Sequence, residues 1–146
     1  MPTSPLQWVS HVTLVAAVLY AFWAGGPPER LTAGAVALAY LASPYAQLFT
    51  SLVEPQYGVL LVDAALLVVL FGLSLAFNRR WLLFATAAHG LGVLTHLAVV
   101  AERALLPRAY LSANIATAYL VLGALTFGAW RHRRRRIVNS PDLYSR

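Results

Sequence analysis

Long apolar stretches separated by short polar segments dominate this sequence. Each stretch holds roughly 20 mostly apolar residues, which is the length that an α-helix needs to cross the hydrocarbon core of a bilayer. We therefore predict an all-α fold, an integral membrane bundle of about five transmembrane helices. It forms a single domain over residues 1–136, followed by a polar tail over residues 137–146. The predicted spans are residues 6–24, 31–53, 57–77, 81–101 and 108–130.

The second stretch is the weakest of the five predicted spans. It is rich in alanine and is interrupted at Ser43-Pro44. Proline inside a helix removes a backbone hydrogen bond and kinks or ends the helix. The alternative is therefore four full spans plus a re-entrant or kinked segment over residues 31–53.

The composition supports a membrane protein and narrows its chemistry. Hydrophobic residues make up 60% of the chain and the mean hydropathy is +0.66, well above soluble averages. All basic residues are arginine, which excludes a retinal or pyridoxal Schiff base, because that needs a lysine amine. The chain has no cysteine, which excludes disulfides, c-type haem and iron–sulfur clusters. The first segment, MPTSPLQW, has no basic residue, so we expect a retained span and not a signal peptide.

Charge in the connecting segments predicts the orientation. By the positive-inside rule, the arginine-rich run after the fifth span stays in the cytoplasm. With five spans, Arg30 and the Asn78-Arg79-Arg80 connection also lie inside, whereas Glu54 and the N-terminus lie outside. All tryptophans fall at span ends, as in the aromatic belts of membrane proteins. We expect a protein of the bacterial inner (cytoplasmic) membrane with its N-terminus outside and its C-terminus in the cytoplasm.

Asp63 lies within the otherwise apolar stretch GVLLVDAALLVVLFGL (58–73), where a carboxylate is costly without a partner. Counting about 1.5 Å per residue from the outer ends places Asp63, His11, His96 and Asn114 all about 8–9 Å deep. We expect Asp63 to pair with His96, because ionisable groups in membranes usually bond to one another. The predicted intramembrane polar layer consists of His11, Tyr45, Gln47, Asp63, His96 and Asn114.

Two functional interpretations of this layer stay open. His11 and His96, on different helices at equal depth, could ligate a b-type haem, as in a haem or quinone-interacting redox membrane protein. A carboxylate beside imidazoles is also typical of proton relays, as in a proton-coupled channel or transporter subunit.

The function that we favour is non-catalytic and needs no cofactor. The sequence has no hydrolase motif, no phosphate loop and too few acids for a carboxylate metal site. It is also small, with short connections. We therefore expect an accessory or interaction subunit of a larger membrane complex, or a homo-oligomer, and no enzyme.

The basic run after the fifth span is expected to anchor the chain and to contact anionic lipid. Each arginine near such a surface contributes about 1 kcal/mol of electrostatic attraction. Nucleic-acid binding is disfavoured, because the run is short and directly follows a span. The predicted lipid-binding residues are Arg131, Arg133, Arg134, Arg135 and Arg136.

Three stretches resemble a group of small uncharacterised bacterial inner-membrane proteins. They are GGPPER (25–30), YGVLLVDAALLVVLFGLSLAF (57–77) and LGVLTHLA (91–98). They are similar to that group's G-x-P-E-R turn, the Asp in its third span and the T-H-L in its fourth. The resemblance covers much of residues 20–100. It implies the span assignment above and gives no activity.

Five spans place the two termini on opposite sides of the membrane, and reporter fusions test this. We expect a C-terminal reporter to be active in the cytoplasm and an N-terminal reporter to be active outside. Two reporters on the same side would contradict five spans and would mean that residues 31–53 do not cross.

Overall fold

The computed structural model describes residues 5–48, 57–101 and 107–138, and these form five helices and no strand. This confirms the all-α fold. Parts of three predictions lie outside the described residues. They are the end of the second span and the connection after it (49–56), the connection at 102–106, and the tail from 139 onward. The helices are α1 (Pro5–Ala24), α2 (Pro27–Gln47), α3 (Tyr57–Phe77), α4 (Arg80–Ala101) and α5 (Pro107–Val138).

Three of these helical segments are long and apolar enough to cross a membrane, which indicates a membrane protein. They are α3, α4 and the Ser112–Val138 part of α5. In α1 the corresponding apolar segment is shorter, Trp8–Ala24. The second predicted span forms one helix that continues through Pro44 as far as Gln47.

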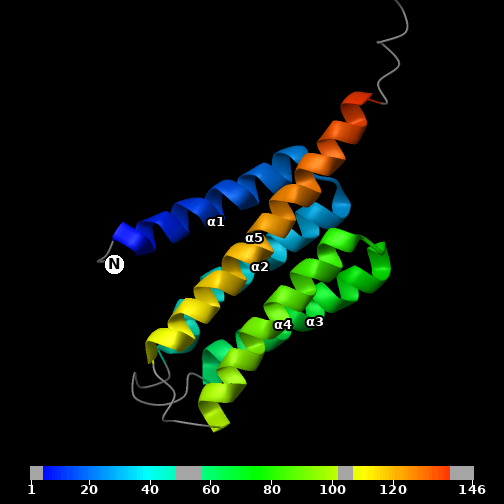
Figure 1. Cartoon of the computed structure of the whole chain (residues 1–146). Helices are drawn as coiled ribbons and strands as arrows, with labels where there is room; N and C mark the ends of the chain where they lie inside the picture. The colour runs from blue at the N-terminus through cyan, green and yellow to red at the C-terminus, as the bar shows by residue number, and fades with distance from the viewer. Residues whose placement is uncertain (1–4, 49–56, 102–106, 139–146) are drawn as a thin grey trace, which may run out of the picture.

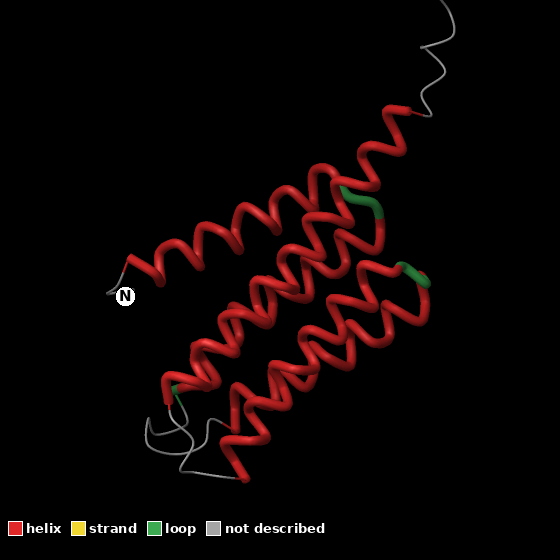
Figure 2. Tube along the Cα trace, viewed as in Figure 1, coloured by secondary structure: helices red, strands yellow, loops and turns green. Residues whose placement is uncertain are grey.

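The five helices form a bundle in which α4 has neighbours on both sides (Figure 1). It packs against α3 and α5, while α2 packs against α3 and α1 crosses α5 and α2. Within the described ranges, α1 makes no contact with α3 or α4. The α1–α2 turn, the α3–α4 turn and the C-terminal part of α5 lie at one end of the bundle (Figure 2). We call this end the arginine end, because Arg79, Arg80 and the arginine run lie there.

The turn between α1 and α2 explains the GGPPER stretch residue by residue. Pro27 and Pro28 occupy the first helical positions, where a backbone N–H would have no helical partner. The Glu29 carboxylate accepts a hydrogen bond from the Gly26 N–H at 2.9 Å, which caps the helix from within. A Cβ atom on Gly26 would lie 2.6 Å from Cε1 of His132. A larger residue at position 26 would therefore have to displace the His132 ring.

The helices α4 and α5 approach each other closely at small residues. The Trp81 ring lies so near to Gly128 that a Cβ atom there would be 2.6 Å from the indole. Small residues at such crossings let membrane helices come together. Trp81 follows the α3–α4 turn, where Asn78 has a φ of 46°, a left-handed conformation that asparagine tolerates at helix ends.

The helix α5 extends further than the sequence suggested. The predicted span ends at residue 130, but the helix continues through the arginine run to Val138. Arginine is a good helix former, and cations in the last turn interact favourably with the helix dipole. The arginines therefore project from a helix and occupy defined sides of it.

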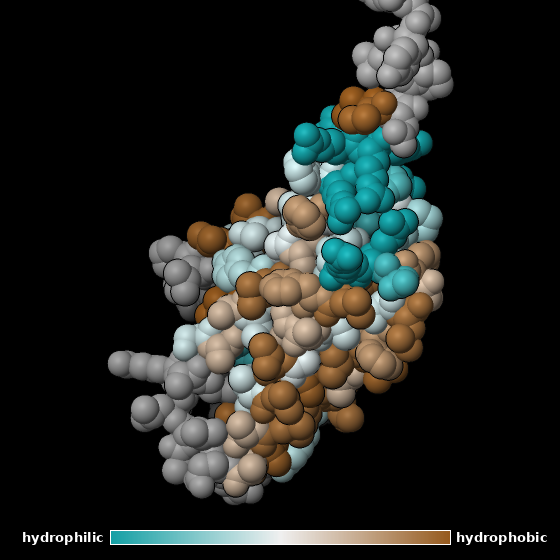
Figure 3. Space-filling view, turned by 45° about the vertical axis from the view of Figure 1, so that its right-hand side comes forward, coloured by the Kyte–Doolittle hydropathy of each residue, from teal (hydrophilic) through white to brown (hydrophobic). Residues whose placement is uncertain are grey.

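Apolar side chains fill the interior and also cover the outside of the bundle. Leu70, Leu82 and Leu125 are fully buried, whereas large side chains such as Leu61 and Val68 are exposed. Figure 3 shows an apolar surface below a polar region at the end of α5. Hydroxyl groups are mostly concealed, as in Thr86, which donates to the Leu82 carbonyl at 2.8 Å. Such a surface suits lipid.

Two glycines of α5 provide a matched test of this packing. Gly128→Ala should lower the free energy of unfolding by about 1–3 kcal/mol, because the added methyl group displaces the Trp81 ring. Gly123→Ala should raise it by up to about 1 kcal/mol, because no atom lies within 4 Å of the new Cβ and alanine favours helix. Thermal melting in detergent, followed by circular dichroism, measures both. Equal effects would contradict the close contact.

Candidate functional site

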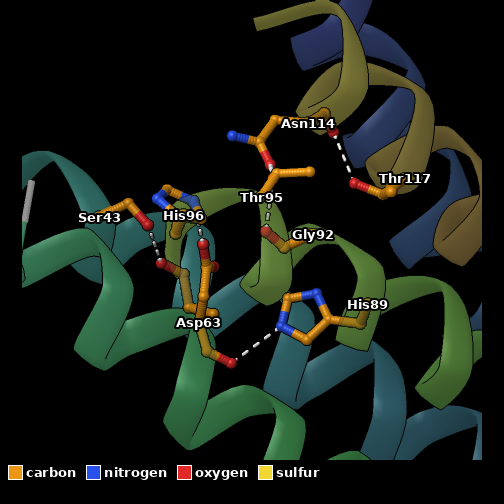
Figure 4. A network of polar contacts seen from close by, with 9 residues as sticks. Ser43, Asp63, His89, Gly92, Thr95, His96, Asn114 and Thr117 are labelled. Atoms are coloured by element: carbon orange, nitrogen blue, oxygen red, sulfur yellow. Dashed lines mark hydrogen bonds and ion pairs between the residues drawn. The ribbon is translucent and has the colours of Figure 1, made fainter. Parts of the chain in front are cut away.

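The carboxylate of Asp63 forms an ion pair with His96 across the α3–α4 interface. Oδ2 of Asp63 lies 2.9 Å from Nε2 of His96 (Figure 4). The His96 side chain is 8% exposed and that of Asp63 is 23% exposed. The pairing expected from the sequence is therefore present. It explains how an apolar helix carries a carboxylate, because the imidazole replaces the water that Asp63 would otherwise need.

A second histidine of α4 also bonds to α3. Nε2 of His89 donates a hydrogen bond to the backbone carbonyl of Asp63 at 2.9 Å. Because a carbonyl can only accept, the proton of the neutral His89 ring is on Nε2. His89 and His96 are seven residues apart and so share one face of the helix. This face is the one that α4 turns toward α3.

A neighbouring set of polar groups connects α4 to α5. The Thr95 hydroxyl shares its proton between the Gly92 carbonyl at 2.6 Å and Oδ1 of Asn114 at 2.8 Å. The Thr117 hydroxyl donates to the Asn114 carbonyl at 3.0 Å. Figure 4 shows these groups beside the Asp63–His96 pair, with Thr95 next to His96 on the same helix. Together they join three helices at one level of the bundle. We call this set the polar cluster: Asp63, His89, Thr95, His96, Asn114 and Thr117.

The bonds of the polar cluster hold α3, α4 and α5 together. With one proton shared between them, on the carboxyl or on the imidazole, Asp63 and His96 form a pair that is neutral overall, which limits the desolvation cost. Oxygen and nitrogen atoms of the cluster bond to one another or to nearby backbone. In the part of the chain that the structure describes, no group of three His, Cys, Asp or Glu side chains could hold a metal ion.

The other predicted members of the polar layer lie elsewhere. His11 is exposed and its ring meets Tyr40 of α2 edge-on, with the ring centroids 5.4 Å apart. Tyr45 is 68% exposed, and Gln47 is also exposed at the end of α2. The structure thus brings together Asp63, His96 and Asn114 of the predicted layer, whereas the His11 ring meets α2, and Tyr45 and Gln47 lie at the exposed end of that helix.

The two histidines considered as haem ligands are not side by side. His11 is on α1 and His96 is on α4, and these two helices do not touch in the described ranges. Nε2 of His96 already faces the Asp63 carboxylate. Among the described residues, His11 and His96 therefore do not face each other across a common space.

The predicted lipid-binding arginines divide into two groups. The Arg133 guanidinium lies 4.1 Å from the Trp23 ring centroid, and that of Arg134 lies 5.5 Å from the Trp130 centroid. These are cation–π contacts at the surface of the bundle. The remaining three, Arg131, Arg135 and Arg136, line a hollow at the arginine end. The run therefore does not form one uniform patch.

Comparisons with protein families, with curated proteins and with solved structures find no match to this chain.

A double-mutant cycle tests whether Asp63 and His96 support each other. Asp63→Leu and His96→Leu should each lower stability by about 1–3 kcal/mol, because each leaves one buried polar group without its partner. The double variant should be more stable than the sum of the two single losses predicts. Asp63→Asn should be mild, since an amide still bonds to imidazole. Melting curves in detergent give the coupling free energy, and a value near zero would contradict the pair.

Proposed function

We propose that this chain is a non-catalytic accessory or interaction subunit of a larger membrane complex. We further propose that it resides in the bacterial inner membrane, with the C-terminus in the cytoplasm and the N-terminus outside. The orientation is supported by the gathering of Arg79, Arg80 and the arginine run at one end. The accessory function is supported by one feature in particular, an apolar groove between α1 and α5.

The groove has a volume of about 790 Å³ and its walls are mostly small or aromatic side chains. The Thr13 hydroxyl donates to the Val9 carbonyl and the Thr126 hydroxyl donates to the Leu122 carbonyl, both at 2.8 Å. These bonds leave the methyl groups as the lining. The groove surface is therefore apolar although its sequence contains threonine. Its small residues are Thr13, Ala16, Ala17, Gly123 and Thr126, and its aromatic residues are Tyr20, Tyr119, Phe127 and Trp130.

A transmembrane helix of another subunit is the occupant that fits this groove. Membrane helices associate by close packing and not by a hydrophobic force, because lipid tails are equally apolar. Small side chains in a concave face allow that packing. A second copy of this chain is a poorer fit, since a two-fold contact would place two hollow faces against each other. The polar cluster lies between α3, α4 and α5, so it stabilises the bundle that presents the groove.

Two glycines provide matched variants for this proposal. Gly123 lies in the groove and Gly72 lies on the outer side of α3, and neither has an atom within 4 Å of an added Cβ. Gly123→Leu should fill the groove and release the partner, whereas Gly72→Leu should retain it. Both changes raise helix propensity by a similar amount, so stability should not separate them. Purification in mild detergent followed by native mass spectrometry measures the assembly.

The proposal requires a second polypeptide in the unchanged and Gly72→Leu preparations and its loss from the Gly123→Leu preparation. A particle that contains only copies of this chain would contradict it. Retention of the partner by both variants would place the interface elsewhere and would likewise reject the groove.

A further inference from the structure

The arginine end of the bundle contains a second hollow, which differs from the groove in its chemistry. It has a volume of about 680 Å³ and lies between the α1–α2 turn, the α3–α4 turn and the C-terminal part of α5. These three segments are far apart in the sequence. Its charged lining comes from Glu29 and five arginines, Arg79, Arg80, Arg131, Arg135 and Arg136.

The charged side chains that line this hollow are mostly positive. Apart from Arg136, the lining has four guanidinium groups and one carboxylate, a formal excess of three positive charges. The carboxylate of Glu29 is 3% exposed and is held by the Gly26 N–H. In the described part of the chain, Arg79, Arg80, Arg131 and Arg135 have no carboxylate partner. Guanidinium groups gathered in this way repel one another until an anion enters.

The helix geometry directs only part of the arginine run into the hollow. Residues 128, 131, 132 and 135 share one side of α5, since they are three or four positions apart. Arg133 and Arg134 project from other sides and stack on Trp23 and Trp130. Arg79 and Arg80 reach the hollow from the α3–α4 turn, which the left-handed Asn78 shapes. Two walls from distant parts of the chain therefore converge on one space.

The other lining groups also favour a bound anion. The backbone N–H groups at the start of α4 point toward its N-terminal end, which carries a partial positive charge. Trp81 is 7% exposed and forms a rigid apolar wall against Gly128. An arginine guanidinium can donate two parallel hydrogen bonds to two phosphate oxygens. Such bidentate binding is specific, unlike the general attraction of counterions to positive charge.

We propose that this hollow binds a phosphate group through Arg79, Arg80, Arg131 and Arg135. The phosphate belongs either to the headgroup of an anionic phospholipid or to a soluble phosphate. The stacked arginines Arg133 and Arg134 take no part in this binding. This assigns a discrete site to residues that the sequence treats as part of a general basic anchor. It does not depend on the accessory function proposed above.

Two double variants that remove the same charge test the site. Arg131→Gln with Arg135→Gln changes the hollow, and Arg133→Gln with Arg134→Gln changes only the stacked pair. Each full-length protein is purified in neutral detergent with added phosphatidylglycerol and examined by native mass spectrometry. The micelle is removed before the ions are detected, so lipid attracted only by diffuse charge is lost and lipid held at a discrete site remains. The hollow variant should bind it about tenfold more weakly, because charge-assisted hydrogen bonds are lost. The stacked-pair variant should stay within about threefold of the unchanged chain.

The source of the phosphate is separated by a second measurement. Thermal melting with excess inorganic phosphate should show stabilisation by a soluble ligand if that is the natural occupant. Retained lipid that inorganic phosphate does not displace assigns the site to a phospholipid headgroup. Stabilisation by phosphate without retained lipid assigns it to a soluble phosphate. Both results require sensitivity to the hollow variant.

Equal weakening by the two double variants would overturn the proposal, since it would leave only general charge attraction. Absence of both lipid retention and phosphate stabilisation would overturn it as well. If the Arg131 and Arg135 variant does not fold, Arg79→Gln with Arg80→Gln changes the opposite wall and replaces it in the same comparison.

Discussion

A carboxylate on an apolar helix must find its hydrogen-bond partners within the protein, and the packing of α3 depends on how Asp63 does so. Among the described polar residues of α3, Asp63 is the one that carries a formal charge. The His96 imidazole bonds to its side chain, and His89 donates a hydrogen bond to its backbone carbonyl. Both histidines extend from one face of α4, which fixes the rotation of α4 about its own axis. An adjacent side of α4 then meets α5 through Thr95 and Asn114. The arrangement of three helices thus follows from one costly group.

The arginine end is organised by a different requirement, which is the close approach of backbone and rings. His132 lies against the turn before α2 where Gly26 has no side chain, and Trp81 lies against α5 where Gly128 has none. These two contacts bring α2, α4 and α5 to a common end. They also hold the arginines of α4 and α5 around one space. Close contacts at small residues therefore fix the helices at the arginine end, and hydrogen bonds fix them at the polar cluster.

The sequence was sufficient for the elements and for one contact of the site. Apolar length and short connections predict the helices, and α3 has the bounds expected of the third span. The Asp63–His96 pair was predicted from the equal depth of the two residues, because counting residues gives the position of each along its helix. Depth alone does not show toward which side of the helix a residue points, and it does not show which helices are neighbours. This is why His11 was placed with His96, although α1 packs on α2 and α5.

The same limitation applies to the arginine run. Composition predicts its charge and its end of the bundle. The division between stacked and hollow-lining arginines depends on the continuation of α5 as a helix and on where Trp23 and Trp130 lie. The sequence could not predict the hydrogen bond of His89 for another reason. Its acceptor is a backbone carbonyl, which every residue type has, so no side chain marks the partner.

That last contact affects how this protein tolerates change during evolution. The hydrogen bond from His89 ends on the main chain, so any amino acid at position 63 would still accept it. Substitution at this position can remove the tie to His96 but leaves α3 and α4 connected. Substitution at position 63 therefore costs the stability that the pair with His96 contributes, while the second tie between the two helices is retained. A survey of variants at that position alone would detect only the side-chain half of the linkage and would underestimate how firmly the helices are joined.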